Sequence, residues 1–287
     1  MNSPAPTGWD ATEPIELDVP QQAPPQAEPI PGEPLQGKHN PRISTPKFLR
    51  LGTVYDELTR QRAAQLIAKY PQSRSALLPL LHLVQSVDGC VSADGIEFCA
   101  EQLGLTAAEV EAVATFYTMY KRTPCGEHLV SVCTNTLCAA LGGDAIYTSL
   151  RAKLGVADQE TAGTPGEPGS VTIESAECLA ACDHAPVVTV NYEFYDRQTV
   201  ESAAELVDEL QAGRRPAPTR GAALSSFKQT ELELAGIFTG EQLSAEVAVP
   251  TASEQTLRGN TYAGEHAQVA PAMPDSYQMP DKPEPKS

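Results

Sequence analysis

Apolar residues recur with the spacing of amphipathic helices between residues 47 and 122. Breaks in this pattern divide the stretch into four short helices, the first three of which end before Pro71, at Asp88-Gly89 and at Gly104. Ser92 can cap the third helix, and Thr106-Ala-Ala-Glu109 has the form of a capping box for the fourth. The pattern therefore predicts a small helical bundle over residues 47–122.

The pattern changes to short alternating strands after a break at Thr123-Pro124-Cys125-Gly126. Leu129 to Cys133 and Val171 to Ile173 are predicted strands, and a cysteine-containing loop follows each of them. Between these strands, Ala139 to Leu154 has helical spacing and is predicted to turn Leu141, Ile146, Leu150 and Leu154 inward. The polar stretch from Asp158 to Gly169 is expected to be a surface loop.

A hairpin and a helix complete this part of the chain. Val187 to Val190, a turn at Asn191-Tyr192 and Glu193 to Tyr195 predict the hairpin. Thr199 can cap a last helix that ends at Gly213. The succession of strands and helices predicts an α/β domain over residues 123–215.

Both ends of the chain differ in composition from these two domains. Residues 1–46 hold eleven prolines, one aromatic residue (Trp9), six acids and two basic residues, so they predict a flexible, disordered tail. Residues 216–287 are again rich in Pro, Ala and Glu and are expected to form an extended, disordered tail. Its apolar pieces, Leu232 to Phe238 and Leu243 to Val249, are expected to pack on a partner surface because they cannot form a core alone.

Two cysteine pairs carry the chemistry of the α/β domain. Four residues separate Cys133 from Cys138, and three separate Cys178 from Cys182. If the two loops meet, four thiolates reach one centre, which suits a [2Fe-2S] cluster or a tetrahedral zinc ion. The first spacing matches the opening of plant-type ferredoxins, but the second does not match their continuation. Zinc, disulfides and a redox-active thiol pair therefore remain open at this point.

Small residues between the cysteines favour the iron-sulfur interpretation. These residues are Thr134, Thr136, Ala180 and Ala181. Because their side chains are short, backbone N–H groups are expected to approach the sulfurs and to donate hydrogen bonds to them, which helps to set the potential of a cluster.

Three other cysteines and two histidines are expected to lie outside the site. Cys90 and Cys99 fall at apolar or turn positions and predict buried structural thiols. Cys125 precedes the first cysteine-bearing strand and should sit at its other end. His82 lies among leucines without a second donor at helical spacing, which predicts a core histidine. His184 borders the second loop and can replace a thiolate, but four cysteines already complete a ligand set.

Composition and the absence of motifs narrow the function. A formal net charge of -17 argues against nucleic-acid binding. The sequence shows no secretory signal and no apolar run of the roughly 20 residues that a membrane span requires, so its seven cysteines are expected to be reduced thiols or metal ligands. It also contains neither a G-x-G-x-x-G nor a P-loop motif. A bound iron-sulfur cluster without a nucleotide site on the same chain predicts a one-electron carrier.

The residues around the two cysteine pairs resemble a known family. They are Val130-Ser-Val-Cys133-Thr-Asn-Thr-Leu-Cys138 with Leu141-Gly-Gly143, and Glu177-Cys178-Leu-Ala-Ala-Cys182-Asp-His-Ala-Pro186 with Val188-Thr-Val-Asn191-Tyr192. Together they are similar to the thioredoxin-like [2Fe-2S] ferredoxin subunit of bacterial NADH:quinone oxidoreductase (respiratory complex I). The resemblance extends from about Lys47 to Arg215.

The resemblance implies a thioredoxin-like domain in which Cys133, Cys138, Cys178 and Cys182 hold a [2Fe-2S] cluster. It further implies that FMN and NADH bind to a partner subunit, and that the chain belongs to the NADH dehydrogenase module on the cytoplasmic face of the membrane. Pro186 resembles the proline that borders the active loop of thioredoxin-like folds. The chain resembles, in the same motifs, the diaphorase subunit of an NAD-linked hydrogenase or formate dehydrogenase, which is one alternative. The alternative from another class of protein is a zinc-stabilised interaction module without redox function.

Overall fold

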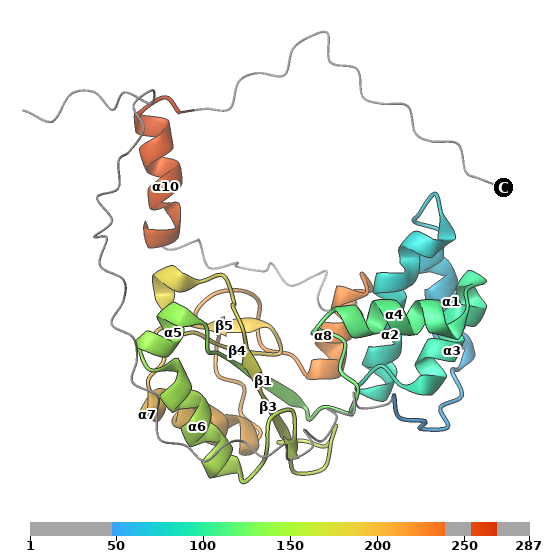
Figure 1. Ribbon diagram of the computed structural model, residues 1–287, viewed down its shortest axis with the longest axis horizontal. Coiled ribbons are helices and arrows are strands. Elements are labelled where there is room, and N and C mark those ends of the chain that lie inside the picture. The colour runs from blue at the N-terminus through green and yellow to red at the C-terminus, as the bar shows by residue number, and fades with distance from the viewer. Residues whose placement is uncertain (1–47, 239–253, 269–287) are drawn as a thin grey trace, which may run out of the picture. The chain divides into compact units, whose positions relative to one another are not determined.

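The structure is a computed structural model that describes residues 48–238 and 254–268 (Figure 1). The Pro-rich stretch predicted as a flexible tail, with Trp9, lies outside the described residues, as does the apolar piece Leu243 to Val249. Within the described ranges, no helix has the length and apolarity needed to cross a membrane.

The four helices predicted at the start of the chain are confirmed. Their bounds are α1 (Glu57–Ile67), α2 (Leu77–Asp88), which follows a 3-10 turn (Ser73–Ala76), α3 (Ala93–Leu103) and α4 (Ala107–Phe116). The Ser92 hydroxyl accepts a hydrogen bond from the Gly95 N–H at 2.9 Å, and Thr106 and Glu109 form the expected capping box. These caps satisfy N–H groups at helix starts that would otherwise lack partners.

Helix α2 supplies much of the core of this bundle. Leu80, Leu81, Leu83 and Val84 are fully buried, together with side chains from α1, α3 and α4. Full burial of an aliphatic side chain of this size contributes about 1.5–3 kcal/mol, so the apolar spacing that predicts the helices also holds them together.

The α/β domain is built on a five-stranded sheet in the order β2-β3-β1-β4-β5. The strands are β1 (His128–Cys133), β2 (Thr161–Ala162), β3 (Val171–Ala176), β4 (Val188–Val190) and β5 (Glu193–Tyr195). β1 and β3 are parallel, and the other pairs are antiparallel. Helices α6 (Gly143–Leu154) and α7 (Val200–Gln211) contribute Ile146, Leu150, Val207 and Leu210 to one core with Val130 and Val132 of β1. The predicted α/β fold is confirmed.

Two details of this domain differ from the prediction. The helix expected over Ala139 to Leu154 is broken into α5 (Thr136–Ala140) and α6, because Gly142 adopts a left-handed conformation with φ 113°. The break turns Leu141 outward, so that 56% of it is exposed instead of buried. The predicted surface loop at Asp158 to Gly169 contains the short strand β2, which pairs with β3.

The segment predicted as an extended C-terminal tail contains helix α8 (Phe227–Leu234), so this prediction is wrong for α8. Leu232 and Ala235 join the core of the bundle, and Phe227 is fully buried against Leu129 and Cys125. The described apolar piece, Leu232 to Phe238, therefore packs in part on the chain itself and not on a partner, since Leu232, Ala235 and Ile237 join the bundle core. Helix α10 (Glu254–Glu265) is a second helix in this range (Figure 1). The domain boundaries 47–122 and 123–215 stay a prediction.

Candidate metal centre

The two cysteine loops begin at the same edge of the sheet. β1 and β3 run parallel, with Cys133 opposite Ala176, so the loop after each strand leaves from neighbouring positions. The Thr134 N–H donates to the Ala176 carbonyl at 2.9 Å, and the Cys133 N–H donates to the Val187 carbonyl at 3.1 Å. Because three segments are tied together here, the position of Cys133 is fixed by the sheet.

The two pairs differ in their exposure to solvent. Cys133 and Cys138 are each only 3% exposed and form a small apolar group with Ala181 and Val187. Cys178 and Cys182 lie at the surface. The site therefore has one side within the protein and one side that faces outward.

The thiols are close enough to affect one another's protonation. Burial raises the pKa of Cys138 to about 11, with contributions from the neighbouring Cys133 and Cys182 sulfurs. The pKa of Cys182 is also raised, by desolvation and then by the nearby Cys178 and Cys133 thiols. The two thiols of each pair thus lie close together, and Cys182 is near enough to the buried pair to interact with it electrostatically. Metal binding must displace these protons, so loading is favoured as the pH rises.

A backbone N–H group donates to a sulfur atom in the second cysteine loop. The Ala180 N–H donates to Cys178 Sγ at 3.4 Å, and Ala180 takes an uncommon positive φ of 53° to do so. The expectation that small loop residues let the backbone reach sulfur is thus confirmed at Ala180. The Thr134 and Thr136 N–H groups bond to oxygen acceptors instead.

The sequence interpretation assigned no packing role to Gly143, the first residue of α6. A Cβ atom added there would lie 2.5 Å from the Cys133 carbonyl oxygen and 2.9 Å from that of Cys138. Only a glycine lets the start of α6 approach the backbone of both cysteines this closely. The Gly142-Gly143 pair just after the second cysteine was the available signal.

Replacing Gly143 with alanine is expected to displace the loop that carries Cys133 and Cys138. The added methyl group overlaps backbone atoms, which cannot rotate away, and overpacking of this kind costs about 1–3 kcal/mol. We expect a lower iron content per chain and a lower melting temperature, measured by metal analysis and thermal unfolding.

The matched control for this variant is Gly259→Ala. Gly259 also lies in a helix, but a Cβ atom there would meet nothing within 4 Å. The change should leave the iron content unchanged and should not lower stability, since alanine is the better helix former. Equal iron loss in both variants would contradict a local role for Gly143.

The other cysteines and histidines lie where the sequence predicts. Cys90 and Cys99 are fully buried, and Cys125 packs on Leu129 and Phe227 at the start of β1. Burial raises the pKa of Cys90 and of Cys125 to about 12, which keeps both protonated and unreactive.

His82 and His184, the two histidines considered as possible ligands, are both buried. His82 lies in α2 and contacts Glu231 of α8. His184 is in the 3-10 turn Cys182–His184, with its Nε2 atom 3.4 Å from Asp183. The peptide bond between Ala185 and Pro186 is cis, which the sequence alone left undecided.

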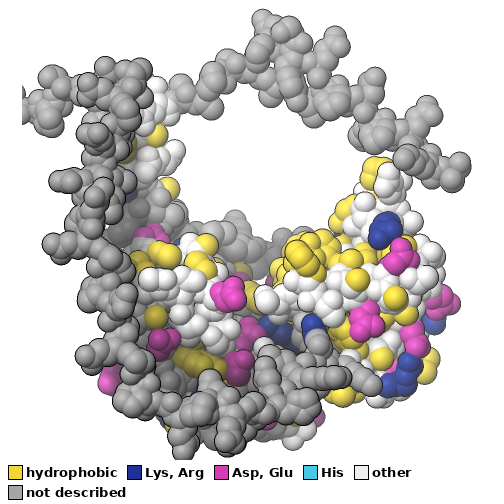
Figure 2. Space-filling view, viewed as in Figure 1, with side chains coloured by type: hydrophobic (Ala, Val, Ile, Leu, Met, Phe, Trp, Pro, Cys, Tyr) yellow, Lys and Arg dark blue, Asp and Glu magenta, His cyan; other side chains and the backbone are white. Residues whose placement is uncertain are grey.

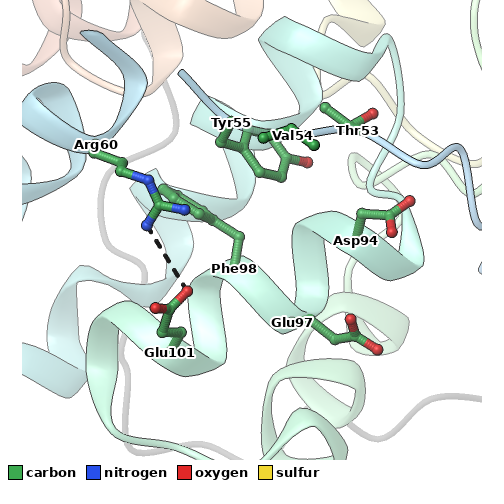
Figure 3. Close-up of a pocket in the computed structure, with 8 residues that line it drawn as sticks. All are labelled: Thr53, Val54, Tyr55, Arg60, Asp94, Glu97, Phe98 and Glu101. Carbon is green, nitrogen blue, oxygen red and sulfur yellow. Dashed lines mark ion pairs between the residues drawn. The ribbon is translucent and has the colours of Figure 1, made fainter. Parts of the chain in front are cut away.

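A hollow of about 230 Å³ on the bundle is separate from the cysteines (Figure 3). Its acidic side chains already have partners, since Arg50 binds Asp94 at 2.9 Å and Arg60 lies 3.8 Å from Glu101. We therefore assign the candidate site to the cysteine loops.

The donor set fits a [2Fe-2S] group. Such a cluster takes four thiolates, two on each iron, and the chain supplies two pairs near enough to interact electrostatically. A backbone N–H donor to sulfur, here from Ala180, is typical of iron-sulfur sites. Among the described residues, no group of three or more His, Cys, Asp or Glu side chains is spaced to hold a single metal ion. The assignment of the four ligands stays a prediction.

The sheet and the two cysteine loops at its edge define a thioredoxin-like protein of the ferredoxin class. The sequence profile of the thioredoxin-like [2Fe-2S] ferredoxin family matches residues 63–211, and the chain belongs to this family. The resemblance found in the residues around the cysteines is confirmed.

Relatives carry a more specific name. The E subunit of the NADH-quinone oxidoreductase of Mycobacterium tuberculosis (strain H37Rv) is 59% identical over 175 residues, which cover 61% of this chain and 68% of the relative. The protein of the same name from Rickettsia conorii is 37% identical over 160 residues, or 55% of this chain and 93% of the relative.

Solved structures give weaker likenesses. An NAD+-reducing [NiFe]-hydrogenase is 20% identical with a TM-score of 0.42, over 47% of this chain and 23% of that one. A thioredoxin-like [2Fe-2S] ferredoxin from Aquifex aeolicus is 21% identical with a TM-score of 0.25, over 31% of this chain and 84% of that one. At these scores neither likeness supports a conclusion about function.

Proposed function

We propose that this chain is the electron-transfer [2Fe-2S] subunit of the NADH dehydrogenase module of an NADH:quinone oxidoreductase. The observation that carries the proposal is the convergence of two cysteine pairs on one sheet edge, in a chain 59% identical to a protein named as a component of that enzyme. The bound cluster would supply one-electron chemistry, since it can exist in two oxidation states.

The chain's own residues hold the cluster and control its surroundings. Cys133, Cys138, Cys178 and Cys182 are the proposed ligands, and the Ala180 N–H orients the Cys178 sulfur. The apolar contacts of the buried pair exclude water from one side of the site. The exposed Cys178 and Cys182 loop lies on the opposite side, where electrons can pass to and from a partner.

Exposed apolar residues beside the cysteines suit a permanent interface. Leu137 and Leu141 flank Cys138 and are 44% and 56% exposed. Figure 2 shows hydrophobic side chains over α5, and a larger group over the end of α4 and α8. Phe116, Tyr117, Leu234 and Phe238 are exposed on these two helices or directly after them. Because clustered exposed apolar residues indicate contact surfaces, these positions support a chain that works in a complex.

The partner in this proposal is the subunit that binds FMN and NADH. The chain shows no G-x-G-x-x-G or P-loop motif of its own, so the nucleotide chemistry is assigned to that subunit. The complex would place the chain at the cytoplasmic face of the membrane, as a peripheral component.

Anaerobic purification with metal analysis tests the cofactor. We expect two iron atoms and two acid-labile sulfides per chain, and a reddish absorbance that dithionite bleaches. A colourless protein that contains zinc and no iron would overturn the proposal.

Co-purification tests the partner, since affinity capture of the chain from its native cells should retrieve a flavin-containing, NADH-oxidising subunit. Retrieval of a hydrogenase or formate dehydrogenase instead would assign the chain to a different enzyme.

A further inference from the structure

One face of strand β1 connects Cys133 to the helical bundle. Side chains alternate along a strand, so Leu129, Ser131 and Cys133 share one face, and Val130 and Val132 point into the core on the other. Leu129 contacts Phe227 of α8, and Cys133 belongs to the candidate site. Ser131 lies between them, two residues or about 7 Å before Cys133.

Ser131 takes part in a charged network that no prediction included. Its hydroxyl donates to Glu174 Oε1 at 2.7 Å, and Glu174 is its cross-strand neighbour on β3. The second oxygen of Glu174 lies 2.6 Å from Lys121 Nζ. The two charged side chains are only 11% and 14% exposed, so this ion pair is largely shielded from water and salt.

Lys121 is held in place by the bundle. The backbone N–H of Lys121 donates to the Gln85 side-chain oxygen at 2.7 Å. Gln85 is fully buried in α2, and its side-chain amide donates in turn to the Met119 carbonyl at 3.0 Å. The Val91 N–H donates to the Lys121 carbonyl at 2.8 Å. The backbone of Lys121 is therefore fixed by α2 and the loop after it, and its ammonium group is presented to the sheet.

Glu174 lies between the two strands that lead to Cys133 and Cys178. Glu174 precedes Cys178 by four residues on β3, and it contacts the strand that ends at Cys133. Reduction adds one negative charge to a cluster held there. A nearby positive charge favours that step and a nearby negative charge opposes it, most strongly where water is excluded.

We propose that the Lys121–Glu174 ion pair is a positioning element that sets the reduction potential of the cluster bound by the cysteine loops. This inference rests on the proposed function. Lys121 balances the negative charge of Glu174 at the sheet. Because Gln85 of α2 holds the backbone of Lys121, the position of this positive charge depends on the bundle.

The test is a redox titration of the full-length, cluster-loaded protein, in which electron paramagnetic resonance measures the reduced cluster at each potential. Lys121→Gln leaves the Glu174 charge uncompensated and should lower the midpoint potential. Glu174→Gln leaves the Lys121 charge and should raise it. The double variant should return towards the wild-type value, and Lys121→Arg, which keeps the charge, should match it. A purely structural role would not give shifts of opposite sign.

Lys153 and Asp208 provide a matched control. They form an ion pair at 2.7 Å between α6 and α7, and Lys153 lies ten residues, or about 15 Å of helix, beyond the start of α6 at Gly143. Lys153→Gln and Asp208→Asn make the same changes of charge and should leave the potential unchanged.

The outcomes separate this inference from the proposed function. A wild-type protein without iron overturns both. A loaded protein in which the Lys121 and Glu174 variants shift in the same direction, or no more than the controls, overturns the inference alone. If Lys121→Gln fails to fold, the upward shift expected for Glu174→Gln still decides the question, because a downward shift or no shift contradicts it.

Discussion

Serine in place of Cys133 or Cys138 is expected to abolish stable iron binding. A serine hydroxyl binds iron more weakly than a thiolate does. Both sulfurs are buried, so a water molecule cannot take the place of the lost ligand. Changes to groups that merely support metal ligands cost 10–100-fold in affinity, so the loss of a ligand should exceed about 100-fold. Iron and sulfide content per chain, together with the visible absorbance, measure the effect.

The exposed pair should respond less severely. Serine at Cys178 or Cys182 leaves a position open to water, so we expect a labile cluster and a changed spectrum rather than complete loss. Cys125→Ala is the control, because Cys125 is equally buried but lies at the start of β1. If Cys125→Ala lost iron while Cys138→Ser retained it, the ligand assignment would be wrong.

Replacing His82 with leucine is expected to destabilise the folded chain by about 1–3 kcal/mol. Glu231 of α8 is fully buried, and its partners are His82 Nδ1 at 2.6 Å and the Tyr192 hydroxyl at 3.2 Å. Without His82, the buried Glu231 side chain loses its closer hydrogen-bond partner and keeps the Tyr192 hydroxyl. Urea unfolding of the wild type and the variant measures the difference.

The double variant His82→Leu/Glu231→Leu separates charge from packing. Replacing both partners of a buried hydrogen bond by apolar groups of similar shape can be nearly neutral, so the double variant should recover most of the lost stability. A double variant as unstable as the single one would show that the loss comes from packing against α2 and not from an unpaired carboxylate.

Local signals were sufficient for the parts of the fold that depend on neighbouring residues. Ser92 and the Thr106-Glu109 box identify helix starts because the caps act within three residues. The Asn191-Tyr192 turn was predictable for the same reason, since both residues take positive φ in a two-residue hairpin. The cysteine pairs were recognisable because two cysteines a few residues apart in one loop can bind the same metal centre.

Features that depend on distant contacts could not be read from the sequence. Gly142 divides the predicted helix, and Gly143 lets the start of α6 approach the carbonyls of Cys133 and Cys138, which is a tertiary constraint. Helix α8 was missed because its apolar residues fill a surface made by two other regions of the chain. Lys121 and Glu174 are separated by 53 positions and carry no local pattern that would join them.

Helix α8 also has a consequence for the order of assembly on the ribosome. It emerges only after the bundle and all five strands have been synthesised, yet it contributes Glu231 to His82 and Phe227 to Leu129. Until then the nascent chain keeps both surfaces open, and domains usually fold in order from the N-terminus. Locking of the bundle to the sheet is therefore the last step of maturation, and a chain interrupted before Phe227 would expose hydrophobic surface of the kind that chaperones bind.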